Sequence, residues 1–260
     1  MPFSLLRFVV AGALLLAVAP AFVQLAPAAA AYSGPRFLGG PDSLRALISR
    51  STRLGTPPPT GRMLVQFELK GGQQPHRFEL LPAPGPMNIT LVTAAATSLS
   101  YLEKQMPDWQ AGTPDLGTEE KASRDAKITL VLDFDANQTV QPYAYADQNP
   151  VFGQQLAQDK NRSSSTFNSS PQGLVQRLQM QLKYPREALI RQKEGVVYAY
   201  FEVAENGAIE HPSILGTAGQ ALDAEVLRLI QKLPAATTPP QLQGRPVRIF
   251  YTLPFTFKIQ

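Results

Sequence analysis

Histidine and cysteine, which often carry catalysis or bind metals, are scarce in this chain. Its 260 residues include two histidines, His76 and His211, and no cysteine. Each histidine stands beside a proline within a predicted strand, so a surface position without a catalytic role is expected for both. The lack of cysteine excludes disulfides, thiolate metal sites and a cysteine nucleophile.

Paired carboxylates are the next candidates. Asp133 and Asp135 are two residues apart on a predicted strand, so they share one face. They could hold a cation, but Ca²⁺ takes about six or more oxygen ligands. We interpret them as solvated charges and predict no metal and no cofactor. The sequence also lacks H-E-x-x-H, G-x-S-x-G and the phosphate-binding G-x-x-x-x-G-K. No catalytic residue is predicted, and an envelope enzyme is only a remote alternative.

The charge pattern excludes another class of function. The net charge of +4 is spread along the chain, whereas nucleic-acid binding needs clustered Lys and Arg with stacking aromatics. Arg245 and Arg248 flank the start of one predicted strand, nothing extends them into a basic stripe, and we interpret them as residues that promote solubility. We expect no nucleic-acid partner, and no small-molecule substrate is evident.

The first 31 residues are typical of an export signal. Arg7 is their only charge, Phe8–Phe22 is an apolar run, and Ala29-Ala30-Ala31 offers a small-residue cleavage site. The alternative is an uncleaved inner-membrane anchor, since the apolar stretch approaches the ~20 residues that span a bilayer. Either way the chain is expected to be exported to the periplasm.

The rest of the chain shows the same series of elements twice, on either side of a polar linker predicted at residues 151–172. Each series predicts a helix, a strand, a turn, a strand, a helix and a strand. The first comprises Pro41–Ser49, Gly61–Lys70, Gly71-Gly72, Arg77–Leu81, Asn88–Gln105 and Lys127–Asp135. The second comprises a helix with Leu174, Leu178 and Leu182, a strand with Val197 to Val203, Asn206-Gly207, Ile209–Leu215, Asp223–Leu233 and Val247–Ile259.

Several landmarks of the two series are 134 residues apart. Gly61 aligns with Gly195, Phe67-Glu68 with Phe201-Glu202, and Gly72 with Asn206. This spacing indicates an internal duplication, although two helix-and-sheet domains can share such patterns by chance. The predicted fold is α+β, with two tandem domains at residues 38–150 and 173–260. Each has an antiparallel sheet of about three strands with two helices.

The last predicted strand has the features of a binding edge. Its thirteen residues are long for a strand, and Pro254 cannot donate to a ladder, which favours an edge position. A long edge strand is a template for a partner strand. Alternatively it is a sealed core strand, in which Pro254 guards against aggregation. One apolar face runs through Val247, Ile249, Tyr251, Leu253, Phe255, Phe257 and Ile259.

Taken together, residues 184–260 resemble the C-terminal domain of TonB-family energy transducers. The resemblance is carried by Tyr184-Pro185, Gly195, Glu205-Asn206-Gly207, Leu222-Asp223, Gly244-Arg245-Pro246 and the final strand. It implies a periplasmic three-stranded sheet with two helices. It also implies that a short extended segment of outer-membrane receptors, the TonB box, adds to the sheet edge as a strand.

The resemblance also assigns residues. Those implied at the partner are Gln181, Tyr184, Pro185, Val247, Ile249, Tyr251, Leu253, Pro254 and Phe255. Those implied as structural are Gly195, Asn206, Gly207, Leu222, Asp223 and Gly244. For Tyr184 and Leu222, core packing is an equally open interpretation.

The chain departs from the transducer pattern outside this domain. Family anchors carry Ser and His, and Phe8–Ala31 has neither; family spacers are long and Pro-rich, and Pro57–Pro59 is the longest Pro run here. The first series has Arg50-Ser51 where Tyr-Pro would stand. We therefore predict a periplasmic TonB-like module in TonB-dependent transport that binds a receptor or another envelope protein. The alternatives are a scaffold protein without a link to transport and a homodimer.

Overall fold

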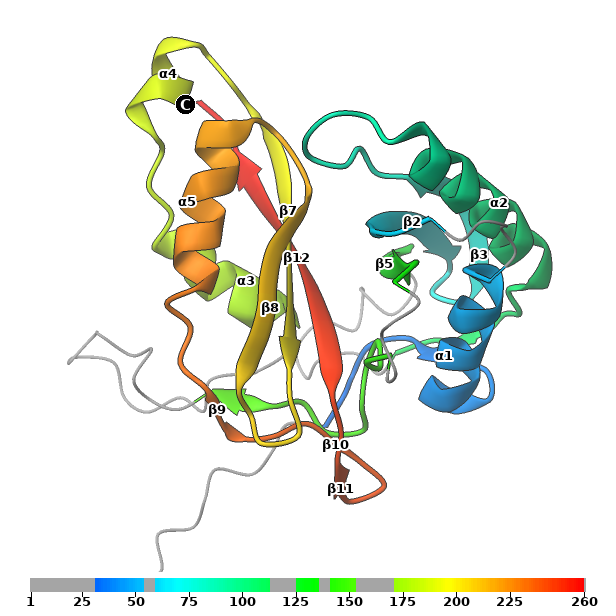
Figure 1. Cartoon of the computed structure of the whole chain (residues 1–260). Coiled ribbons are helices and arrows are strands. Elements are labelled where there is room, and N and C mark those ends of the chain that lie inside the picture. The colour runs from blue at the N-terminus through cyan, green and yellow to red at the C-terminus, as the bar shows by residue number, and fades with distance from the viewer. Residues whose placement is uncertain (1–30, 54–58, 113–124, 136–140, 153–170, 260) are drawn as a thin grey trace, which may run out of the picture.

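Two three-stranded antiparallel sheets organise the protein (Figure 1). The computed structural model describes residues 31–53, 59–112, 125–135, 141–152 and 171–259. Nearly all of the predicted export segment and most of the predicted linker lie outside these residues. In both sheets the first strand of a hairpin is central, its return strand lies on one side, and the last strand of the series lies on the other.

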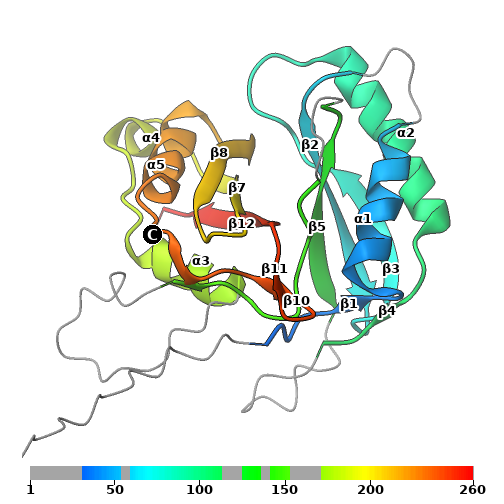
Figure 2. The same ribbon diagram turned by 60° about the horizontal axis from the view of Figure 1, so that its bottom comes forward.

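The first sheet has the order β3-β2-β5 and carries two helices on one face (Figures 1 and 2). Met63, Val65, Phe67 and Leu69 alternate along its central strand and are buried in one core. Asn88 caps the second helix by accepting a hydrogen bond from the Leu91 N–H. The elements are α1 (Gly40–Ser51), β2 (Arg62–Lys70), β3 (Gln74–Leu80), α2 (Ile89–Gln105) and β5 (Ala126–Asp133).

The second sheet has the order β12-β7-β8. Its helical layer includes a short helix that the sequence did not predict, so three helices accompany this sheet among the described residues and not two. The apolar face predicted for the last strand is buried against these helices. The elements are α3 (Pro171–Met180), α4 (Arg186–Ile190), β7 (Gly195–Val203), β8 (Ile209–Gly216), α5 (Gln220–Ile230) and β12 (Ile249–Phe257).

One of three short strand pairs among the described residues joins the two series. The residues Val151–Phe152, which the predicted linker includes, form β6 and pair with β9 (Ala236–Thr238). Phe152 is buried in the core of the second sheet, so the chain reaches this core before the linker. The other pairs are β1 (Arg36–Phe37) with β4 (Trp109–Gln110), and β10 (Gln241–Leu242) with β11 (Arg245–Pro246).

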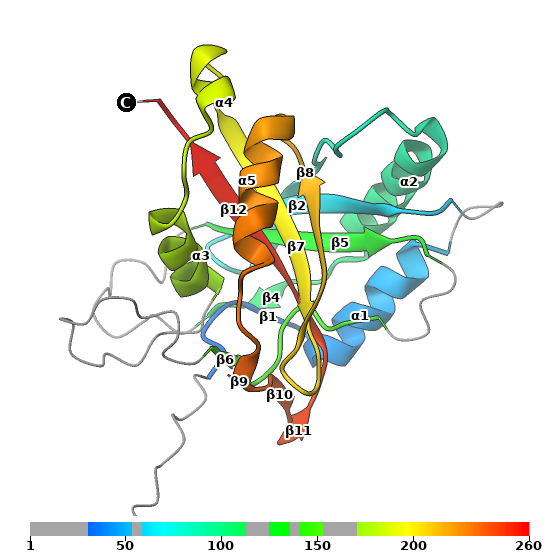
Figure 3. The same cartoon turned by 60° about the vertical axis from the view of Figure 1, so that its left-hand side comes forward.

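The faces of the two sheets that carry no helices pack against each other (Figure 3). Helices therefore form the outer layers and sheets the inner ones. This packing explains Phe250, the one apolar residue on the otherwise polar side of the last strand, because it is 7% exposed between the sheets. The contact buries Leu64, Leu81 and Val131 of the first series against Tyr200, Leu215 and Phe250 of the second.

Several predicted elements have different bounds in the structure, and for two of them local hydrogen bonds show the cause. The final strand covers nine residues and not thirteen, because the Val247 N–H bonds the Pro240 carbonyl and Ile259 bonds Glu194. The second hairpin has a loop of residues 204–208 in place of a two-residue turn. Within it, Gly207 takes a φ of 84° and Asn206 accepts a hydrogen bond from the Ala208 N–H.

Candidate functional site

The last strand, β12, lies at an edge of its sheet. It pairs with β7 over its whole length, from Ile249 opposite Val203 to Phe257 opposite Gly195. No other named strand of the described residues pairs with it. The edge position inferred from Pro254 is therefore confirmed, and the missing N–H of this residue costs the ladder nothing if it faces outward.

The hydrogen bonds at the start of β12 show which residues face outward. The Phe250 N–H donates to the Tyr143 carbonyl, and the Tyr143 N–H donates to the Arg248 carbonyl. Because backbone groups alternate along a strand, the even-numbered residues direct their N–H and C=O away from β7. Gln179 agrees with this parity, since its side chain donates to the Thr256 carbonyl at 2.7 Å.

The outward edge is covered at its start by Tyr143, and near its end the Gln179 side chain bonds the Thr256 carbonyl. Tyr143 forms a parallel bridge to Ile249 and covers the beginning of the strand. Its hydroxyl donates to Asp42 at 2.8 Å, and Arg45 stacks on its ring at 4.0 Å, so α1 holds this segment in place. Beyond it, the N–H groups of Thr252 and Thr256 have no partner among the described residues.

This geometry changes the role of the predicted strand residues. Ile249, Tyr251, Leu253 and Phe255 have buried side chains, at most 4% exposed, and their backbones face β7. A partner at the edge would meet the even-numbered residues, which the sequence interpretation named only at Pro254. Val247 lies before β12 and packs against the core.

The residues of the Tyr-Pro motif lie near the far end of β12. The Tyr184 ring packs edge-on against Phe257 at 5.4 Å, and its hydroxyl donates to the Lys193 carbonyl. Pro185 is the N-cap of α4. Gln181 is exposed just after α3. The structure therefore gives Tyr184 and Pro185 packing roles and leaves the Gln181 side chain in solvent.

The motif residues predicted as structural occupy turns and a helix start. Leu222 is buried in the second core, and Asp223 accepts hydrogen bonds from Thr217 at 2.6 Å and from the Ala218 N–H. Gly195 begins β7 with a φ of 149°, and Gly244 takes a φ of 76° between β10 and β11. These contacts stabilise the fold and do not form a ligand site.

A buried carboxylate between the sheets was not found from the sequence. Glu202 is fully buried and accepts hydrogen bonds from Tyr200 at 2.6 Å and from Arg248 at 2.9 Å. His211 lies 3.3 Å away and Arg62, from the first sheet, 3.8 Å away. Burial acts to raise the pKa of Glu202, but the hydrogen bonds from Tyr200 and Arg248 and the charge of His211 lower it overall.

The same cluster corrects two predictions about charged residues. Asp133 is 9% exposed and binds the Arg62 guanidinium at 2.6 Å, so it is not a solvated surface charge; Asp135 is exposed. Arg248 is not a solubility residue, because it also binds Glu210. Both predictions were wrong for one reason, since periodicity within a strand does not show that a second sheet covers its polar face.

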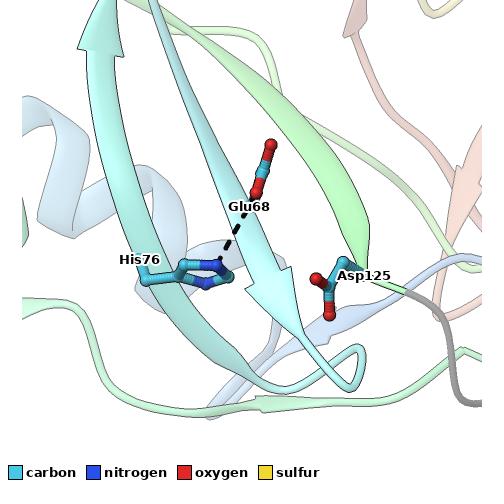
Figure 4. A group of neighbouring side chains, drawn as sticks. All are labelled: Glu68, His76 and Asp125. Carbon is cyan, nitrogen blue, oxygen red and sulfur yellow. Dashed lines mark ion pairs between the residues drawn. The ribbon is translucent and has the colours of Figure 1, made fainter.

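One cluster of metal-ligand types lies at the far end of the first sheet (Figure 4). Ligand atoms of Glu68, His76 and Asp125 lie within 4.8 Å of one another. The His76 Nε2 faces the Glu68 Oε2 at 3.6 Å, but Arg77 binds the same oxygen at 2.9 Å. A metal ion would have to displace this guanidinium, so the arrangement is better suited to an ion-pair network than to a metal site.

Residues 171–259 thus form a small antiparallel sheet with an edge strand and a helical layer. The comparison with known families agrees with this arrangement. Residues 180–259 match the family described as Gram-negative bacterial TonB protein C-terminal. The chain therefore carries a TonB C-terminal domain, as its motifs predicted.

Comparisons with curated proteins and with solved structures identify no relative. Within the described part of the chain, none of the helices combines the length and apolar character needed to cross a membrane.

Proposed function

We propose that the protein is a periplasmic module of TonB-dependent transport that binds an outer-membrane receptor segment by strand addition. The outward N–H groups of Thr252 and Thr256, which lack a partner among the described residues, are the observation that supports this role most strongly. The matched family, whose members act as binding and energy-transducing proteins, supports the kind of partner. A strand that added here would pair with the outward groups of Thr252, Pro254 and Thr256, and it would displace Gln179 from the Thr256 carbonyl.

Strand addition explains the construction of this edge. The strand is fixed on one side by nine register pairs with β7 and below by a core of buried aromatics. A preformed edge lowers the entropy that binding must overcome. We propose no catalytic role, because no described cluster combines a nucleophile with a base and a site for a reacting atom.

A matched pair of substitutions at Thr256 tests the proposal. Thr256→Pro removes the outward N–H and adds a ring at the edge, whereas Thr256→Ala removes only side-chain atoms. Neither breaks the ladder to β7, and β12 already contains a proline. Synthetic peptides that carry the TonB box of outer-membrane receptors are titrated against the full chain by fluorescence anisotropy.

The expected result is a selective loss of affinity. One backbone hydrogen bond contributes about 1 kcal/mol, so Thr256→Pro is expected to weaken binding by about fivefold or more and Thr256→Ala by much less. Thermal unfolding should show that both variants fold. Equal affinities of the two variants for a peptide that binds would contradict strand addition at this edge. A chain that binds none of the receptor peptides would point to the scaffold alternative.

A further inference from the structure

The first sheet crosses the second sheet from its inner edge toward the open edge. At the start of β2, the Arg62 guanidinium lies 4.9 Å from the centre of the Tyr200 ring of β7, and Asp133 of β5 binds the same guanidinium. Further along β2, the Gln66 amide donates to the Tyr198 hydroxyl of β7 at 3.4 Å. On β5, the Thr129 carbonyl lies 3.5 Å from the Thr252 hydroxyl of β12. From Asp133 to Thr129, β5 thus passes from the region of β7 to β12, and Figure 3 shows the two strands crossing.

Two more residues along this direction carry the first sheet past β12. Two residues of a strand advance ~6.6 Å, which exceeds the ~4.8 Å between neighbouring strands. Glu68 follows Gln66 by two residues on β2. Lys127 is two residues from Thr129 on β5, in the same direction because the strands are antiparallel. The same direction carries Lys127 outward from Thr129, past β12, and carries Glu68 from β7 toward β12.

The overhanging residues present charges on the face that a bound strand would meet. Glu68 and Lys127 are register partners, so their side chains are on the same face as Gln66 and Thr129. Arg77 of β3 binds Glu68 at 2.9 Å, and His76 and Asp125 lie beside it (Figure 4). We call Glu68, Arg77 and Lys127 the roof of the edge.

Of the charged roof residues, Glu68 has ion-pair partners, whereas Lys127 has none among the described residues. Glu68 has Arg77 and His76 within ion-pair distance. Lys127 is exposed and makes no ion pair among the described residues. Every second side chain of an added strand would point toward the first sheet, since side chains alternate across a strand. A negative side chain on that face could meet Lys127 without displacing an existing pair.

We propose that the first sheet acts as a specificity element for the open edge and selects strands that direct an acidic side chain toward Lys127. This inference rests on the proposed strand addition. The first sheet then has a role in recognition. β12 supplies backbone hydrogen bonds that any added strand can form, whereas the roof residues distinguish between partner strands of different sequence.

A charge reversal with a matched control tests the proposal. Short random peptides are selected by display on the full chain, and the binders are then synthesised with either Asp or Lys at each alternate position. Each peptide is titrated against the wild type, Lys127→Glu and Lys104→Glu. Lys104 is also exposed, but it lies in the last turn of α2, on the helical side of the first sheet.

The inference predicts a reciprocal change at one peptide position. Lys127→Glu should weaken the Asp peptide about threefold, in the range of an exposed ion pair, and should strengthen the Lys peptide. Lys104→Glu should change neither, and the effect should shrink at high salt. If Thr256→Pro weakens binding while Lys127→Glu has only the effect of Lys104→Glu, the result would contradict the specificity role of the first sheet and would leave strand addition at β12 supported. If Thr256→Pro leaves binding unchanged, the proposed function itself fails.

Discussion

The hairpins of the two sheets differ most at a pair of equivalent glutamates. Glu68 and Glu202 are 134 residues apart, and each hairpin has a register irregularity at that point. The register partner of each glutamate is followed on the return strand by a residue without a register partner, and these residues, Arg77 and His211, take a positive φ of 55° and 52°. The side chain of Glu68 is 25% exposed, whereas that of Glu202 is 1% exposed.

The crossing of the sheets explains this difference. Glu202 lies under the first sheet, where Arg62 reaches it, and Glu68 lies at or beyond the edge of the second sheet. Equivalent positions have thus become a buried network in one hairpin and a charged surface in the other. The shared strand order and bulges are consistent with the predicted duplication, but the family match begins at residue 180, so the duplication stays a prediction.

The largest expected effect separates the two glutamates directly. Glu202→Gln leaves Arg248 and Arg62 close to an uncharged group in a buried site, and breaking such a network by removing one partner costs about 3 kcal/mol. Glu68→Gln affects a partly exposed pair and should cost less than about 1 kcal/mol. Urea unfolding of both variants measures the difference. Similar losses of unfolding free energy would show that Glu202 is not the buried member of the pair.

Two equivalent glycines give a second, smaller contrast. Gly61 and Gly195 both begin a central strand with positive φ, at 129° and 149°. A Cβ at Gly195 would lie 2.8 Å from the Ala218 Cβ, whereas one at Gly61 would meet the flexible end of Leu91. Alanine is strained at either site by about 1–3 kcal/mol. Gly195→Ala should cost more in thermal unfolding; the reverse order would mean that the helical layer of the second sheet adapts more easily than that of the first.

The smallest expected effect is on how the unfolding free energy depends on pH. Glu202 has a pKa below its ordinary value of 4.5 in the folded protein, so its stabilising effect is present above pH 4.5 and is lost as the pH falls through the lowered pKa. The unfolding free energy of the wild type should fall over this acidic range. The unfolding free energy of Glu202→Gln should fall less steeply. If the unfolding free energies of the wild type and Glu202→Gln fell equally with pH, Glu202 would not be a source of the acid sensitivity.

The sequence predicted the positions of the strands better than the contacts that their side chains make with the other sheet. The alternation in Met63–Leu69 and the position of Pro254 were enough to place a buried strand and an edge strand, because both patterns reflect local geometry. The roles of Asp133, Arg248 and Phe250 could not be predicted, because they depend on which face of one sheet meets the other. Nor did the apolar face of the last strand indicate its binding groups, since the outward hydrogen bonds belong to the even-numbered residues between its buried ones.

The most direct test of the open edge is amide hydrogen exchange of β12 in the free protein and with a bound receptor peptide. The Thr252 and Thr256 N–H groups face outward, whereas those of Leu253 and Phe255 face β7. We predict fast exchange at Thr252 and Thr256 in the free protein and strong protection in the complex, with Leu253 and Phe255 protected in both. A peptide that binds and leaves Thr252 and Thr256 exchanging at their free rates would contradict strand addition at β12.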